Sequence, residues 1–173
     1  MTHRGAEGPS GPAIIAALRN ADIEFVAAVP DIVTSDGLLW PLSCEHSPRL
    51  IRICKEDEGI SICAAMSLAE TRAILLMQQT GLMDSLNALR AMGMDYRLPV
   101  CMMVGLQGKE PDVPMEHSAS YGVRIIGPVL DAMGVRYSML NGPSDVDSIG
   151  VHITAAYAES RPHCFLFGRS PVP

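Results

Sequence analysis

Three consecutive carboxylates, Glu56, Asp57 and Glu58, stand where an apolar run over residues 50–54 gives way to an Ala-rich helical pattern. One interpretation is electrostatic, because acidic side chains are stabilised in the first turn of a helix by its dipole. The other is chemical, because a carboxylate at a ligand-binding edge backed by apolar side chains is partly desolvated, as functional carboxyls often are. The pattern by itself leaves both interpretations open.

A second polar group lies between a strand-like run and a helical one. Gln78, Gln79 and Thr80 precede Gly81, where the chain turns from the run over 72–78 into the next helix. Amide side chains both donate and accept hydrogen bonds, which suits the edge of a heterocycle. A glycine at such a turn lets another group approach the backbone closely. The competing interpretation is an ordinary polar turn with Thr80 as the helix N-cap.

The sequence lacks the glycine-rich motifs of nucleotide sites. Neither G-x-G-x-x-G nor the P-loop pattern occurs, so a dinucleotide or nucleoside triphosphate is not expected as the ligand. The histidines and cysteines do not have metal-ligand spacing, and we predict no metal site on this chain.

Strand-like and helix-like segments alternate along the chain. Continuous apolar runs predict strands over 24–29, 50–54, 72–78, 98–105, 136–140 and 163–168. Helical spacing predicts helices over 12–22, 35–42, 56–70, 81–92 and 144–159, and one more within 117–133 that breaks near Gly127-Pro128. Strands that are apolar throughout are covered on both faces, which is typical of an α/β fold with a parallel sheet. We therefore predict a parallel sheet of about six strands with helices on both faces.

In such sheets, ligands bind at the carboxyl ends of the strands. The residues that follow the predicted strands are therefore the candidate site, and they come from widely separated parts of the sequence: 30–31, 55–56, 78–81, 106–108, 141–142 and Arg169.

Composition excludes several classes of protein. The chain has 173 residues and a formal charge of −6, with 48% hydrophobic and 18% charged residues. It is too apolar to be intrinsically disordered and lacks the basic footprint of a nucleic-acid binder. Its apolar runs are far shorter than the roughly 20 residues that span a bilayer. Because average domains are about 25% charged, either the interior is large or part of the surface is covered by a partner.

The chain is long enough for one domain. We expect a flexible N-terminal tail over residues 1–11, which is polar and rich in Gly and Pro, and a domain over 12–173. Five cysteines without a C-x-x-C pattern, and no secretory signal, favour buried thiols in a reducing, cytoplasmic compartment.

Several segments taken together resemble a known family. They are Val29-Pro30-Asp31, the stretch Glu-Asp-Glu-Gly-Ile-Ser-Ile-Cys-Ala-Ala at 56–65, and Met-Gln-Gln-Thr-Gly-Leu at 77–82 followed by Asn87. The chain resembles the pyrimidine-binding part of thiamine-diphosphate-dependent 2-oxo acid decarboxylases, above all the alpha subunit of sulfopyruvate decarboxylase and the matching half of phosphonopyruvate decarboxylase. The likeness extends from about residue 12 to 167.

The resemblance implies a role for one glutamate at the start of the helix after the second strand. Its carboxyl would hydrogen-bond the pyrimidine nitrogen of the cofactor and favour the tautomer that activates the thiazolium carbon. Gapless matching to the nearest relatives gives this role to Glu56. Matching to a more distant pattern gives it to Glu58, and Glu56 is our choice.

Further site residues are implied by the same resemblance. Gln78, Gln79, Thr80 and Gly81 would line the pyrimidine edge, with Asn87 further along the helix. Pro30 and Asp31 would face the substrate, together with His117. The chain departs from the family at Met83 and Asp84, where Gly and Asn are common.

The family binds the diphosphate through Mg²⁺, using a Gly-Asp-Gly motif that this sequence does not contain. The resemblance therefore implies that a separate pyrophosphate-binding beta subunit holds the Mg²⁺, within a homo- or hetero-oligomer with an apolar interface. The substrate would be a small anionic 2-oxo acid carrying a sulfonate or phosphonate. Arg52, Lys109 and Arg169 are candidates to bind that second anion. A non-catalytic, flavodoxin-like binding module remains the alternative.

Overall fold

Six apolar segments form a single parallel sheet in the computed structural model, which describes residues 8–173. The strands are β1 (Ile23–Ala28), β2 (Arg49–Arg52), β3 (Arg72–Gln78), β4 (Cys101–Gly105), β5 (Arg136–Leu140) and β6 (His163–Phe167). Their order is β2-β1-β3-β4-β6-β5, and every neighbouring pair is parallel. The predicted α/β fold is confirmed.

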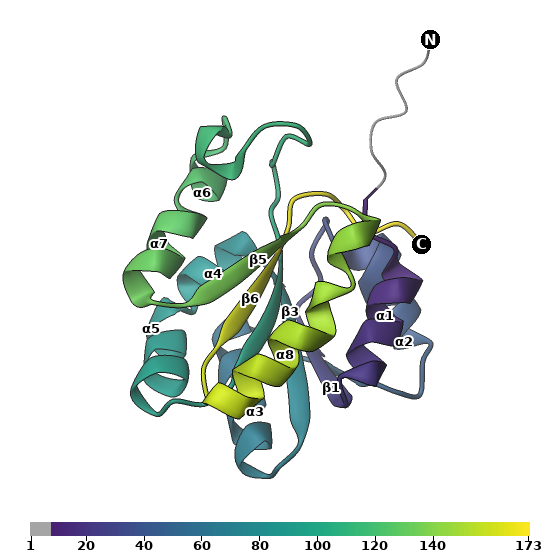
Figure 1. The fold of residues 1–173 in the computed structure, drawn as a ribbon, viewed down its shortest axis with the longest axis vertical. Helices are drawn as coiled ribbons and strands as arrows, with labels where there is room; N and C mark the ends of the chain where they lie inside the picture. Colours follow the sequence, from purple (N-terminus) through teal and green to yellow (C-terminus); the bar gives the residue numbers. More distant parts are fainter. Residues whose placement is uncertain (1–7) are drawn as a thin grey trace.

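Helices cover both faces of the sheet (Figure 1). One face carries α1 (Gly11–Asn20), the π-helical turn Ser35–Leu39, α2 (Trp40–Ser43) and α8 (Ser148–Glu159). The other carries α3 (Glu56–Leu68), α4 (Gln79–Asp84), α5 (Leu86–Leu89), the π-helical turn Arg90–Asp95, α6 (Tyr121–Arg124) and α7 (Ile126–Met133).

Strand β3 shows why these runs are apolar throughout. Ile74 and Leu76 pack in the core under α1 and α8, while Leu75 and Met77 pack in the core under α3 and α4. Successive side chains of a strand point to opposite faces, so covering both faces requires apolar residues at every position.

The helix predicted over 81–92 is divided. It begins at Gln79, is interrupted at Ser85 and ends in the π-helical turn Arg90–Asp95. The buried Ser85 hydroxyl donates to the carbonyl of Gly81 at 2.7 Å. A serine that bonds back to the preceding turn competes with the regular backbone pattern and often bends a helix.

Two other helix boundaries also differ from the predictions. The break predicted near Gly127-Pro128 lies at Ile125, because Pro128 falls in the first turn of α7, where the missing N–H costs nothing. Helix α8 begins at Ser148, and the predicted cap Ser144 lies in a short 3₁₀ turn over Pro143–Asp145.

Of the tail expected over residues 1–11, residues 1–7 lie outside the described part. Residues 8–11 correct the expectation, because they pack against the C-terminal segment. Val172 N–H donates to the carbonyl of Pro9 at 2.9 Å, and Gly11 N–H donates to Val172 at 2.8 Å. Helix α1 begins at Gly11 with Ser10 as its N-cap.

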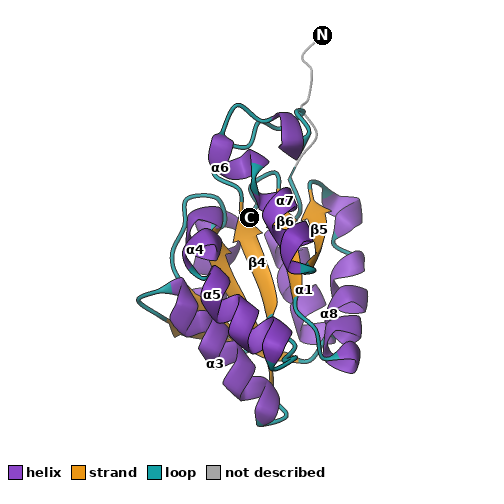
Figure 2. Ribbon diagram, turned by 90° about the vertical axis from the view of Figure 1, so that its left-hand side faces the viewer, coloured by secondary structure: helices purple, strands orange, loops and turns teal. Residues whose placement is uncertain are grey.

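None of the helices within residues 8–173 combines the length and apolar character needed to cross a membrane. The carboxyl ends of the strands meet at the end of the molecule where α6 and the long connection after β4 lie (Figure 2). The residues at this edge form the candidate site.

Candidate active site

The carboxyl group of Glu56 lies directly against the backbone of Gly81. Glu56 is the first residue of α3, and Gly81 is in the first turn of α4. A Cβ atom built on Gly81 would lie 2.2 Å from both Cδ and Oε1 of Glu56. The glycine predicted to allow a close approach thus makes room for the candidate glutamate of the same chain. The structure brings these two predicted site residues together.

The neighbouring carboxylates are engaged locally. Glu58 accepts hydrogen bonds from the N–H groups of Cys54 and Lys55, at 3.2 and 3.4 Å, and so satisfies donors at the start of α3. Asp57 accepts from the N–H of Glu58 at 3.0 Å. Within the described residues the half-buried carboxyl of Glu56 has neither a hydrogen bond nor an ion pair, so its oxygens remain available to a ligand.

Gln79 is buried, and its amide is fully used by one loop residue. Its Nε2 donates to the carbonyl of Gln107 at 2.9 Å, and its Oε1 accepts from the N–H of Gln107 at 2.8 Å. Gln79 therefore connects the β3–α4 turn to the loop after β4, and it does not offer its amide to a ligand. Gln78 is more exposed and donates to the Oε1 of Gln107 at 2.6 Å.

The other predicted cofactor residues lie at the surface of α4 and α5. Thr80 is exposed within α4, whose N-cap is Gln78, so the alternative prediction of a Thr80 cap is wrong. Asn87 is exposed, and its Oδ1 accepts from Arg90 at 3.1 and 3.2 Å. Asp84, one of the two departures from the family pattern, lies 3.8 Å from Lys55 Nζ and links α4 to the start of α3.

Asp31 lies at the sheet edge as expected, but its carboxylate turns into its own loop. Its Oδ1 accepts from the N–H groups of Val33 and Thr34 at 2.7 and 3.0 Å, and its Oδ2 accepts from the Thr34 hydroxyl. Burial raises the pKa of Asp31, and these hydrogen bonds act in the opposite direction. The expectation of a substrate-facing carboxylate is corrected accordingly, whereas Pro30 beside it is exposed.

His117 makes no hydrogen bond or ion pair with the other predicted site residues within the described part of the chain. It ends the short 3₁₀ turn Met115–His117 and is exposed, and its backbone N–H donates to Pro114 at 2.9 Å. Its side chain lines neither of the two cavities found along this edge, although Met115 and Glu116 beside it line the second.

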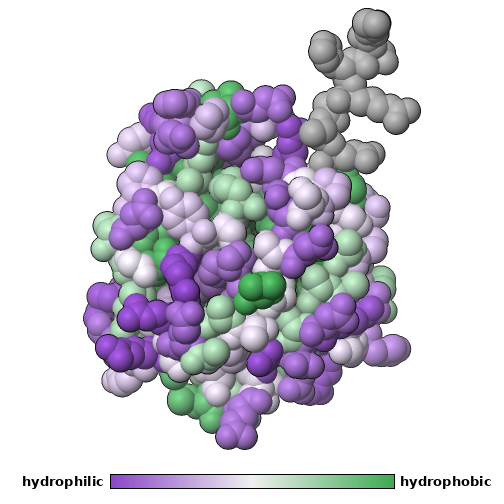
Figure 3. All heavy atoms as spheres, viewed as in Figure 1, coloured by the Kyte–Doolittle hydropathy of each residue, from purple (hydrophilic) through white to green (hydrophobic). Residues whose placement is uncertain are grey.

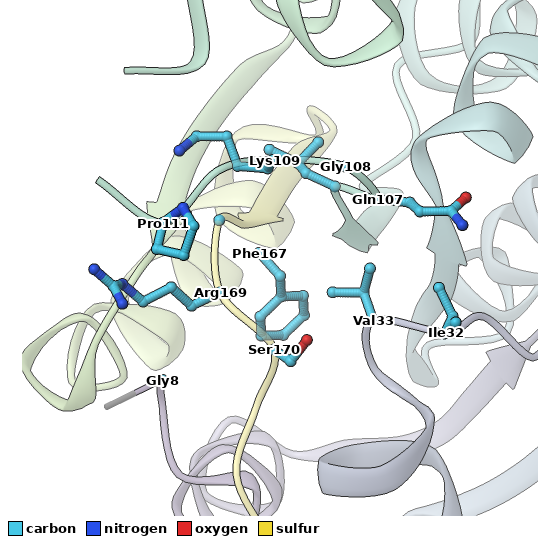
Figure 4. Close-up of a pocket in the computed structure, with 12 residues that line it drawn as sticks. Gly8, Ile32, Val33, Gln107, Gly108, Lys109, Pro111, Phe167, Arg169 and Ser170 are labelled. Atoms are coloured by element: carbon cyan, nitrogen blue, oxygen red, sulfur yellow. The ribbon is translucent and has the colours of Figure 1, made fainter. Parts of the chain in front are cut away.

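A cavity of about 390 Å³ opens at the carboxyl edge, and we call it the edge cavity. It lies among the loops that follow β1, β4 and β6 (Figure 4). Its lining includes the apolar Ile32, Val33, Leu106, Pro111 and Phe167, the polar Gln107 and Ser170, and the cationic Lys109 and Arg169. Gln107 belongs to the segment 106–108 that the sequence placed at the candidate edge, although the sequence assigned it no particular role.

The position of the edge cavity, whose Ile32 and Val33 follow β1, agrees with the topology of the sheet. The chain leaves β1 toward the face of α1 and leaves the adjacent β3 toward the face of α3, as the two core clusters show. Strand ends at such a divergence form the usual ligand crevice of an open α/β sheet. Within the described residues, no group of three or more His, Cys, Asp or Glu side chains is placed to hold a metal ion.

The fold is that of a known class of enzyme. The structure of benzoylformate decarboxylase from Polynucleobacter necessarius superposes with a TM-score of 0.68 at 14% identity, covering 95% of this chain and 31% of that one. At this identity the likeness shows a shared fold. No protein-family model matches the chain.

The sequence is similar to particular decarboxylase subunits. It is 28% identical over 142 residues to the sulfopyruvate decarboxylase subunit alpha of Methanothermobacter thermautotrophicus, covering 82% of this chain and 84% of that protein. It is 26% identical over 154 residues to the sulfopyruvate decarboxylase of Methanosarcina acetivorans, covering 88% of this chain. The matched part spans only 38% of that longer relative. The resemblance first seen in the motifs is confirmed.

Proposed function

We propose that this chain is the alpha subunit of a thiamine-diphosphate-dependent decarboxylase acting on a small anionic 2-oxo acid such as sulfopyruvate. Residues 12–173 would form its pyrimidine-binding domain, with phosphonopyruvate as the alternative substrate. The observation that carries the proposal is the placement of Glu56 against Gly81, at the carboxyl edge of the sheet. The relatives named sulfopyruvate decarboxylase subunit alpha support it.

The cofactor would supply the carbon nucleophile and the electron sink for loss of CO₂. Glu56 would hold a proton against the pyrimidine nitrogen, since its carboxyl is half-buried and its neighbours leave it unpaired. Gly81, Gln78, Thr80 and Asn87 would lie along the pyrimidine. Gln79 would act indirectly, by fixing the backbone of Gln107.

We propose that Mg²⁺ and the diphosphate are held by a beta subunit, because the chain lacks Gly-Asp-Gly. Pro30, the loop held by Asp31, and His117 would then border the substrate from this side. A partner seated over the edge would bring the exposed His117 into a closed site. Such an oligomer would work in the cytoplasm, where its thiols stay reduced.

The test is reconstitution with a partner chain that contains Gly-Asp-Gly and a downstream Asn. With thiamine diphosphate and Mg²⁺ the pair should release CO₂ from sulfopyruvate, and the alpha chain alone should not. Glu56→Gln should lower kcat by at least about 100-fold, as loss of an acid–base group does. Glu58→Gln is the matched control, and it should lower the stability of the chain by no more than the loss of a helix cap does.

Two outcomes would contradict the proposal. If Glu58→Gln lost all activity while Glu56→Gln retained it, the glutamate that bonds the pyrimidine nitrogen would be Glu58 and not Glu56. Absence of heat in calorimetry with thiamine diphosphate, with and without the partner, would favour the non-catalytic binding module.

A further inference from the structure

Two cationic side chains that lie 60 residues apart in sequence meet at the edge cavity. Lys109 comes from the loop after β4, and Arg169 comes from the segment after β6. Strands β4 and β6 are neighbours, paired from Cys101 with His163 to Gly105 with Phe167. The next residue continues the pairing, since Leu106 N–H donates to the carbonyl of Phe167 at 3.2 Å.

The backbone that carries each side chain is fixed by hydrogen bonds, and Lys109 Nζ also donates to the carbonyl of Glu110. Residues 106–109 form a tight turn in which Lys109 N–H donates to the carbonyl of Leu106 at 3.2 Å and Gly108 has φ of +84°. A positive φ at the third position is typical of a type II turn and suits glycine. Arg169 follows Phe167 and precedes Val172, whose hydrogen bonds to residues 9 and 11 fix the C-terminal segment.

Both cationic groups lie on the Pro111 side of the cavity, as Figure 4 shows. The Arg169 side chain is only 14% exposed, and it pairs at 2.6 Å with Asp112, which is 88% exposed. The opposite side of the cavity is formed by the apolar Val33 and Ile32.

We infer that the edge cavity binds the terminal oxyanion of a short dianionic acid, with Lys109 and Arg169 as the residues that select for the second negative charge. The inference rests on the proposed function for the identity of the substrate as a 2-oxo acid. The third candidate, Arg52, ends the outer strand β2 and is exposed, and it is not among the residues lining the cavity.

The cavity fits such a ligand in size and in polarity. Small-molecule sites commonly measure about 300–1,000 Å³, and the edge cavity is at the small end, at about 390 Å³. An apolar wall and a cationic wall together match a molecule with a short carbon chain ending in a sulfonate or phosphonate. A monoanion of the same length has no second negative charge to interact with the cationic wall, so charge would set the specificity.

The test uses the full chain alone, with sulfoacetate as an unreactive dianionic probe and acetate as the monoanion. In ¹H–¹⁵N spectra, sulfoacetate should shift the backbone signals of residues 106–109 and 167–170. Lys109→Met and Arg169→Met should each weaken its binding by about tenfold, the usual effect of losing one charged hydrogen bond. Arg52→Met removes the same charge at the other candidate position and should leave binding unchanged.

A second variant excludes a misfolding explanation. Asp112→Asn removes the carboxylate that competes for Arg169, so binding of sulfoacetate should become tighter. Acetate binding as tightly as sulfoacetate, equal weakening by Arg52→Met, or no shift at either segment would overturn the inference. Since the assay needs neither cofactor nor partner, a chain that binds sulfoacetate yet shows no decarboxylase activity would refute the proposed function while leaving this site standing.

Discussion

The carboxyl group of Glu56 occupies the space where a side chain on Gly81 would otherwise lie. Two residues separated by a strand and a helix thereby depend on each other for position. Position 81 requires a small residue because a side chain approaches its backbone closely. At residue scale, the candidate site is defined by this contact and by the local engagement of Asp57 and Glu58.

Gly81→Ala should impair the site more than the fold. The three atoms nearest to the new Cβ all belong to the flexible side chain of Glu56, which can rotate away, so the free energy of unfolding should change by less than about 1 kcal/mol. The affinity for thiamine diphosphate in the assembled enzyme should fall by about tenfold, because the carboxyl would be displaced.

The matched control is Gly122→Ala in α6, where an added Cβ meets nothing within 4 Å. It should retain both stability and affinity. Calorimetric titration with the cofactor and urea unfolding measure the two quantities. Unchanged cofactor affinity in Gly81→Ala would show that the position of Glu56 does not matter.

At the scale of elements, the β3–α4 turn and the loop after β4 form one unit. Both ends of the Gln79 amide bond the backbone of Gln107, and the two residues are 28 positions apart. Strands β3 and β4 are adjacent, with Gln78 opposite Gly105, so their following residues emerge side by side. This connection places Gln107 and Lys109 along the edge cavity.

Gln79→Leu should therefore destabilise the chain, while Gln78→Leu should not. Losing both hydrogen bonds of Gln79 should cost about 1–3 kcal/mol, because the peptide groups of Gln107 lose their partners. The Gln78 amide reaches only the exposed side chain of Gln107, so its loss should cost under about 0.5 kcal/mol.

Urea unfolding and hydrogen exchange at the Gln107 amide distinguish the two variants. Exchange at that amide should accelerate in Gln79→Leu alone. Equal unfolding midpoints for the two variants would mean that the Gln79 hydrogen bonds contribute nothing to the stability of this loop.

At the scale of the whole molecule, a buried histidine couples the core to pH. His163 begins β6, stacks on His152 with ring centroids 4.5 Å apart, and shares a 2.7 Å hydrogen bond with Ser138. Burial, and then the charges of His152 and Arg136, lower the pKa of His163 to about 4. The folded state therefore keeps His163 neutral under conditions in which the unfolded chain would protonate it.

Stability should consequently decline as the pH falls from about 6.5 to about 4. In this window the unfolded state binds a proton that the folded state does not, so unfolding becomes easier, by up to about 3 kcal/mol. Above this window His163 is neutral in both the folded and the unfolded state, so it adds no pH dependence to the free energy of unfolding. Urea unfolding across this range measures the effect.

His163→Phe, which keeps a flat ring in the core, should flatten this part of the stability profile. The exposed His46 provides the control, and His46→Gln should keep the wild-type slope. An unchanged slope in His163→Phe would assign the acid sensitivity to other groups.

The hydrophobic core accounts for only part of the high apolar content of the sequence. Two clusters of buried residues fill both faces of the sheet, as the uninterrupted strand patterns require. Among residues 8–173, six large hydrophobic side chains are nevertheless exposed, at Ile32, Trp40, Leu68, Tyr96, Tyr121 and Val151. Figure 3 shows polar and apolar residues intermixed on the face of α8, so this view does not present one broad apolar surface for a partner.

The sequence by itself determined the elements and the class of fold. Both ends of β3 and of β5 fall where they were predicted. For β3 the reason is that burial on two faces leaves a signal in consecutive residues. Helix boundaries were less accurate at Ser85, Ile125 and Ser148, where single hydrogen bonds or the position of one proline decided the outcome. The resemblance supplied Glu56 and Gly81 from local motifs.

Only the tertiary structure decided which of the candidates lie together. The order of the strands places β4 beside β6, and this brings Lys109 and Arg169 to one cavity while Arg52 ends at the outer strand. The inward turn of Asp31, the use of the Gln79 amide by Gln107 and the exposed position of His117 follow from loop geometry. The Gln79 hydrogen bonds join residues 28 positions apart, and the edge cavity brings together residues 60 positions apart. No periodicity along a chain encodes a pairing at such separations.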